Sequence, residues 1–139
     1  MIDAETRARI AHHEAGHACV AIALGVAVGE IIVHETGGDC RLCGDPDVRT
    51  AALIFLAGSI AERRWDPALP LDRMLCARYD EDVAWTLLDG SARVIRVHRA
   101  LAARLVDQHW AAIRLIARTL SRDRILSGDA VLALMERAA

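Results

Sequence analysis

The sequence feature that most restricts the fold is an apolar run near the N-terminus that carries two histidines four residues apart. The segment Ala11-His12-His13-Glu14-Ala15-Gly16-His17-Ala18 continues without a charge to Leu24. Residues four apart on a helix lie one turn above each other, so His13 and His17 would share a face, with Glu14 beside them. Because the second half of this helix is apolar nearly all round, we expect it to be central and buried.

This spacing is the H-E-x-x-H arrangement of zinc hydrolases. A catalytic zinc ion takes three protein ligands and keeps a fourth position for water, whose pKa it lowers toward ~7. His13 and His17 would be two of the ligands, and Glu14 would take the proton of the water and pass it to the leaving amine. The alternative is a structural helix that happens to carry two histidines at the edge of the core.

Length and composition favour one domain, residues 1–139, with 54% apolar residues. The longest uncharged apolar stretches, Ala18 to Gly29 and Ala51 to Ala61, are shorter than the ~18 residues of a membrane span. The acidic N-terminus does not resemble a signal peptide, so we expect a soluble, cytoplasmic protein with reduced cysteines. The net charge is −2 and the basic residues, all arginine, are spread along the chain, which argues against a nucleic-acid partner. Because no apolar stretch is long enough to span a bilayer, we expect no membrane partner either.

The pattern predicts a mainly helical fold with a short strand or hairpin after the first helix. Capping residues and turn formers set the expected boundaries. We expect a first helix from the N-cap Asp3 to about Leu24, then a strand at Glu30–His34 that is stopped by Gly37-Gly38 and has a partner near Cys40–Cys43. A second helix would run from Asp45-Pro46 to near Trp65, followed by a turn-rich connection at Leu71–Arg78 and a helix at about Asp80–Leu88. A long helix from Ser91 to about Leu120 and a last helix opened by Ser127-Gly128-Asp129 would complete the chain.

Five segments together resemble the peptidase domain of the FtsH-type ATP-dependent zinc proteases. They occur in the family's order and cover nearly the whole chain. They are His13-Glu14-Ala15-Gly16-His17-Ala18, the strand with Ile31-Ile32, the segment Leu56-Ala57-Gly58-Ser59-Ile60-Ala61-Glu62, Asp80 with Ala84 four residues on, and the tail Ile125-Leu126-Ser127-Gly128-Asp129-Ala130-Val131.

The resemblance implies a mainly helical, zincin-like peptidase fold, a Zn²⁺ cofactor and a third ligand. In the family that ligand is the Asp of an Asn-Asp-Leu-x-x-Ala segment, which corresponds here to Asp80. Tyr79 stands where the family has Asn. Asp82 is the second candidate, and because residues two apart on a helix point to different sides, Asp80 and Asp82 cannot both serve.

Other zinc-enzyme classes can be tested against the spacing. A metzincin would need a histidine at the position of Ala23, which excludes that class. A thermolysin-like site would take a later glutamate, and Glu35 is at a suitable distance along the chain but lies at a strand end. Glu62 has two interpretations: a hydrogen-bond partner of a ligand histidine, or an exposed carboxylate paired with Arg63 or Arg64.

The remaining candidates have mainly structural interpretations. His12 lies ~100° around the helix from His13, which indicates a solvated or packed histidine. Cys40-x-x-Cys43 has metal-ligand spacing, and His34 or Cys76 could complete a second zinc site; ordinary hairpin thiols are the alternative. His98 and His109 have no ligand spacing. Trp65, Trp85 and Trp110 occur singly on three helices, which is typical of core or interface packing.

The sequence thus predicts a zinc metallopeptidase acting on a peptide or unfolded protein, with the strand at Ile31–His34 offering its edge to an extended substrate. A separate ATPase chain or a homo-oligomer would be its partner. The alternative is an inactive or regulatory zinc-binding module that acts through a partner. It is motivated by the family's ATPase module, which these 139 residues do not contain, and by the short segment between the first strand and the second helix, which in the family supplies the sheet edge for the substrate.

Overall fold

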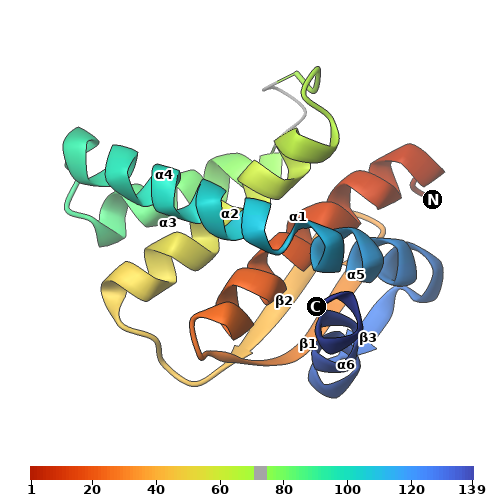
Figure 1. The fold of residues 1–139 in the computed structure, drawn as a ribbon. Coiled ribbons are helices and arrows are strands. Elements are labelled where there is room, and N and C mark those ends of the chain that lie inside the picture. Colours follow the sequence, from red (N-terminus) through yellow and green to blue (C-terminus); the bar gives the residue numbers. More distant parts are fainter. Residues whose placement is uncertain (71–74) are drawn as a thin grey trace.

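The computed structural model describes the backbone of residues 1–70 and 75–139 and the side chains of residues 1–70 and 78–139. It confirms a mainly helical fold with a small sheet after the first helix (Figure 1). The helices are α1 (Ala4–Ala23), α2 (Val48–Trp65), α3 (Leu75–Leu87), α4 (Ala92–Gln108), α5 (Trp110–Asp123) and α6 (Gly128–Ala138). The strands are β1 (Ala27–His34), β2 (Gly37–Cys43) and β3 (Ile125–Ser127).

Helix α1 runs through the middle of the molecule, as its apolar second half predicts (Figure 1). Every residue from position 10 to position 21 is buried. Asp3 is the N-cap and accepts a hydrogen bond from the Thr6 backbone N–H at 2.7 Å. Gly25 follows the helix with a φ of +82°, a left-handed conformation that glycine adopts without a side-chain clash. Both predicted boundaries of this helix are therefore confirmed.

The sheet has the order β2-β1-β3, and both pairs are antiparallel. Ile31, at its centre, lies opposite Cys40 on one side and Leu126 on the other, and it is fully buried. The sequence predicted β1 and β2 but not β3. Because β3 pairs with β1 at Glu30–Ile32, the prediction that β1 offers a free edge to a substrate is wrong.

Gly37 and Gly38 do not stop the first strand but begin β2, after a turn at residues 35 and 36. A Cβ atom at Gly38 would lie only 2.6 Å from Cγ of Glu14. This glycine is therefore required by the close approach of β2 to α1, and not by a turn.

Three predicted helix boundaries are wrong. Asp47, and not Asp45, is the N-cap of α2, where it accepts a hydrogen bond from the Thr50 backbone N–H at 2.8 Å. The helix expected from about Asp80 begins at Leu75, and residues 71–74 of the expected turn-rich connection lie outside the described residues. The single long helix after Ser91 is two helices that meet at His109, because α4 packs against α2 whereas α5 packs against α1.

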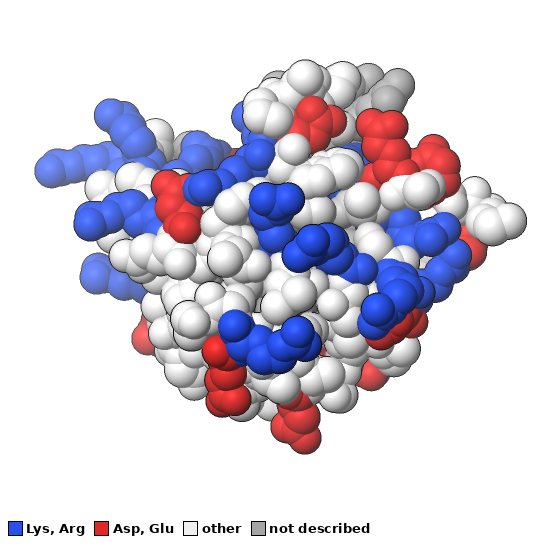
Figure 2. All heavy atoms as spheres, turned by 45° about the vertical axis from the view of Figure 1, so that its right-hand side comes forward, with Lys and Arg blue, Asp and Glu red and all other residues white. Residues whose placement is uncertain are grey.

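Two groups of buried apolar side chains hold these elements together. The larger joins α1, the sheet, α5, α6 and one side of α2, and the smaller joins α2, α3 and α4. Arginine side chains gather across the middle of the face that Figure 2 shows. Within the described part of the chain, no helix combines the length and apolar character of a membrane-crossing segment.

Candidate metal centre

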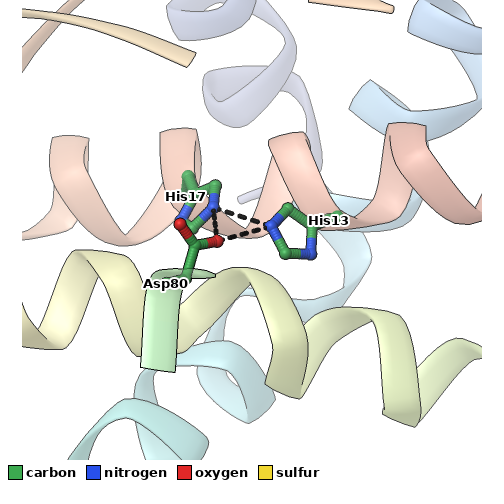
Figure 3. Close-up of side chains that lie close together, drawn as sticks. All are labelled: His13, His17 and Asp80. Atoms are coloured by element: carbon green, nitrogen blue, oxygen red, sulfur yellow. Dashed lines mark hydrogen bonds and ion pairs between the residues drawn. The ribbon is translucent and has the colours of Figure 1, made fainter. Parts of the chain in front are cut away.

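The three predicted metal ligands come together in the folded chain. His13 and His17 project from successive turns of α1, and Asp80 on α3 points at both rings (Figure 3). Oδ2 of Asp80 lies 2.7 Å from Nε2 of His13 and 3.0 Å from Nε2 of His17, and the two Nε2 atoms are 3.0 Å apart. All three residues are buried. Asp82, the second candidate for the third ligand, is exposed on α3.

A second hydrogen bond fixes the orientation of each imidazole. Nδ1 of His13 donates to Oε2 of Glu62 at 2.9 Å, and Nδ1 of His17 donates to the backbone carbonyl oxygen of Ile54 at 2.6 Å. Glu62 is only 3% exposed and also contacts Arg9 at 3.3 Å. Of the two interpretations of Glu62, the hydrogen bond to a predicted ligand histidine is the one observed.

These bonds determine which atoms face the centre of the cluster. A carboxylate and a carbonyl oxygen only accept hydrogen bonds, so both Nδ1 atoms carry a proton, and each ring presents its Nε2 lone pair to the centre when it is neutral. Two nitrogen lone pairs and a carboxylate oxygen thus converge within 4.8 Å of one another. Three electron donors at this separation repel unless a cation or additional protons lie between them, and two imidazoles with one carboxylate are a ligand set that zinc accepts. The donor set therefore fits a zinc ion.

The charges in the cluster shift the pKa values of its members. Burial disfavours the charged form of His13, but the carboxylates of Asp80, Glu62 and Glu14 outweigh it and raise its pKa to about 10. Burial also disfavours the charged form of Asp80, and the hydrogen bonds and charges of His13 and His17 reverse this, lowering its pKa to about 2. Without a metal the pair is an imidazolium beside a carboxylate, so a proton occupies the place that a metal would take.

Glu14 borders the same cleft as the cluster. The cleft has a volume of ≈ 260 Å³ and is lined by residues of α1, α2, α3 and β2. Burial raises the pKa of Glu14, and the charges of His17 and His13 offset only part of this increase. Gly38 and Cys40 of β2 line the cleft opposite the helices, so the carboxyl group lies between the cluster and a sheet strand.

The close approach of α2 to α1 depends on two glycines. A Cβ atom at Gly58 would lie 2.5 Å from Nε2 of His17 and 2.7 Å from Nε2 of His13. A Cβ atom at Gly16 would lie 2.7 Å from that of Ala61. Sequence reasoning missed the role of Gly58 and the acceptor carbonyl of Ile54. The Gly58-containing segment was part of the family resemblance, whereas a backbone carbonyl has no residue-type signal.

Other sequence candidates lie away from this cluster. Glu35 is exposed and pairs with the N-terminal amine at 3.2 Å and with Arg124 at 3.3 Å. Cys40 and Cys43 are three apart on a strand, so their side chains point to opposite faces. Among the residues whose side chains are described, His13, His17 and Asp80 are the only group able to share a metal; Cys76 lies outside that set.

Among the remaining histidines and tryptophans, His34 and Trp85 are exposed, and the others are buried or partly buried. His12 is buried and stacks on Trp65 with ring centroids 5.0 Å apart. His98 is buried and its Nδ1 donates to the carbonyl oxygen of Val94 at 2.8 Å. His109 connects α4 to α5. These observations agree with the packing interpretation of His12 and His98.

A scan against models of known protein families finds no match, and a search of curated proteins finds no relative. The likeness to the FtsH-type peptidase domain is therefore carried by the sequence segments quoted above, and membership of that family stays a prediction. The geometry of the cluster does not depend on it.

Proposed function

We propose that this protein is a zinc-dependent metallopeptidase in which His13, His17 and Asp80 hold the metal and Glu14 is the general base. One observation carries the proposal: two oriented Nε2 lone pairs and a carboxylate oxygen converge at a cleft that also contains a buried glutamate. A purely structural histidine pair would need neither a third converging ligand nor an unpaired carboxyl group beside it.

The chemistry follows from the positions of these groups. A zinc ion, when bound, supplies Lewis acidity and lowers the pKa of a water molecule toward ~7. Glu14, one residue from His13, takes a proton from the attacking water and delivers it to the leaving amine. Its raised pKa brings the carboxyl group closer to the pH at which both proton transfers are efficient. Glu62 and the carbonyl of Ile54 keep the two rings oriented throughout.

We infer that the substrate is an extended peptide or an unfolded protein segment, bound along β2 instead of β1. Strand β2 pairs with β1 on one side, and no described strand pairs with its other side. Gly38, Asp39 and Cys40 of β2 also line the cleft beside the metal ligands. An extended chain can add to such an edge through main-chain hydrogen bonds, which would bring a peptide carbonyl to the cleft.

The test compares the wild type with Glu14→Gln on an unfolded, casein-like substrate. The amide keeps the size of the side chain but cannot act as a base, so we expect zinc content to stay at about one ion per chain while hydrolysis falls by about 10²–10⁴-fold. Glu5→Gln is the matched control, because Glu5 is exposed in the first turn of the same helix. It should cleave like the wild type.

Two results would overturn the proposal in different ways. Full activity in Glu14→Gln would remove Glu14 from the mechanism. Zinc-loaded wild type that cleaves no member of a diverse peptide library would instead support the alternative, a zinc-binding regulatory module that acts through a partner.

A further inference from the structure

A second cavity lies between the N-terminal half of α1, the C-terminal end of α2 and α5. Its volume is ≈ 350 Å³ and it shares no lining residue with the cleft at the metal ligands. The side chains that give it its chemical character are Arg7, His12, Trp65, Arg114, Arg118 and Ser121. The size falls at the lower end of the ~300–1,000 Å³ typical of small-molecule sites.

The cavity is strongly basic. Arg7, Arg114 and Arg118 line it, and none of its lining residues is acidic. No carboxylate of the described residues forms an ion pair with any of these three arginines. Nε of Arg7 is buried and has no hydrogen-bond acceptor among the described residues. The cavity therefore presents three guanidinium groups that no carboxylate of the described residues neutralises.

One wall of the cavity is aromatic and rigid. The ring of His12 stacks on Trp65 at 5.0 Å and lies 6.0 Å from Trp110 on α5. Nδ1 of His12 donates to the carbonyl oxygen of Ala8 at 2.7 Å, which fixes the ring. The guanidinium of Arg64 lies 4.7 Å over the ring of Trp110. Trp65 therefore reaches the cavity as a fixed, apolar surface beside three cationic groups.

We propose that this cavity binds a small phosphate monoester that carries a planar ring. A phosphate dianion offers several acceptor oxygens, which match the planar forks of guanidinium groups and form charge-assisted hydrogen bonds with them. The indole of Trp65 supplies an apolar face for the ring. The positive charge of the three arginines would attract an anion to this cavity. The proposal uses no metal ligand, so it stands or falls independently of the peptidase proposal.

The test uses the full chain, loaded with zinc and labelled with ¹⁵N, and follows the indole N–H signals during titration. The probes are phenyl phosphate, glycerol phosphate and inorganic phosphate. We expect saturable binding of phenyl phosphate that shifts the Trp65 signal and leaves that of Trp85 unchanged, because Trp85 lies on α3 away from the cavity. Phenyl phosphate should bind at least tenfold more tightly than the two phosphates without a ring.

Charge reversal identifies the binding groups. Arg118→Glu should weaken phenyl phosphate binding at least tenfold, and because Arg118 is exposed the variant should retain its fold. Arg96→Glu makes the same charge change at an exposed position on α4, outside the cavity, and should bind like the wild type.

Three results would overturn the proposal. The first is the absence of saturable binding to the wild type. The second is an equal loss of affinity in Arg96→Glu and Arg118→Glu, which would show a general charge effect. The third is equal affinity for phenyl phosphate and inorganic phosphate, which would remove the ring contact with Trp65.

Discussion

At the residue scale, the site depends on what holds each imidazole in place. Nδ1 of His13 donates to a side-chain carboxylate, whereas Nδ1 of His17 donates to a backbone carbonyl oxygen. Only the partner of His13 can be removed by substitution. Glu62 is therefore the residue through which the orientation of a predicted ligand can be tested without touching a ligand.

We expect Glu62→Ala to lower zinc affinity by about 10–100-fold, the usual effect of removing a hydrogen-bond partner of a ligand histidine. The His13 ring would lose its acceptor, and Arg9 would lose a buried partner. Competition with a chromophoric chelator measures the affinity. The control is Glu81→Ala, which removes a partly exposed carboxylate that pairs with Arg99. Unchanged affinity in Glu62→Ala would show that the hydrogen bond does not orient the ligand.

The raised pKa of His13 makes a separate prediction about protons. With a pKa of about 10 in the metal-free protein, the ring is protonated on both nitrogens near neutral pH. Zinc must displace the Nε2 proton, so we expect at least about one proton to be released per zinc ion near pH 7, and affinity to rise about tenfold per pH unit until His13 titrates. Calorimetry in buffers of different ionisation enthalpy measures the release. Binding without proton release would contradict the charge state assigned to His13.

Residue types predicted part of this site. The His-Glu-x-x-His spacing identified His13, Glu14 and His17 because side chains four apart on a helix share a face. The family resemblance indicated Asp80, and residue spacing alone did not exclude Asp82. The carbonyl of Ile54 could not be predicted, because every residue carries a carbonyl and only the tertiary fold selects one.

At the scale of elements, the site requires α2 to lie unusually close to α1. Gly58 and Gly16 provide that closeness, because each faces the opposite helix where a methyl group would overlap neighbouring atoms. The interface between these helices is therefore part of the site, although neither glycine has a side chain that could bind a metal.

We expect Gly58→Ala to reduce zinc affinity at least about tenfold by displacing both rings, whose positions must be kept to within about 0.5 Å. The expected loss cannot come from a weaker helix, because alanine raises helix propensity by ~1 kcal/mol over glycine. Ser59→Ala is the control, since Oγ of Ser59 only donates to the carbonyl oxygen of Leu56 at 3.2 Å. The same chelator competition applies. Equal affinity in both variants would mean that the helices can separate without moving the ligands.

The sequence predicted helix boundaries that local hydrogen bonds determine. It did not predict the elements that tertiary packing determines. The caps Asp3, Ser91 and Ser127 are all observed, because each side chain accepts a hydrogen bond from its own helix. Asp45 and Asp47 are both of a residue type that favours the N-cap position, so the sequence could not choose between them. Strand β3 has three residues, too few for an alternating pattern, and it forms only because β1 is adjacent.

The break at His109 has a similar origin. The apolar pattern continues across it without glycine or proline, so the sequence predicts one helix. The chain turns there because α4 covers α2 whereas α5 covers α1 and the sheet. Such a division between two packing surfaces has no local sequence signal.

At the scale of the whole molecule, the fold brings distant segments to one cleft. Asp80 is separated from His13 by 67 positions, and β2 completes the wall opposite the helices. The central position of α1 between the sheet and α2 makes this possible (Figure 1). The order of helices and strands along the chain could be predicted in outline. The sequence could not show which strand has a free edge beside the site, because that depends on the pairing of β3 with β1.

The most direct test of the central claim is an anomalous-scattering map, collected at the zinc absorption edge from crystals grown with zinc. We expect one strong peak about 2.0–2.2 Å from Nε2 of His13, Nε2 of His17 and a carboxylate oxygen of Asp80. A peak at other residues, or a zinc ion held by the two histidines with the Asp80 carboxyl group turned away, would contradict it.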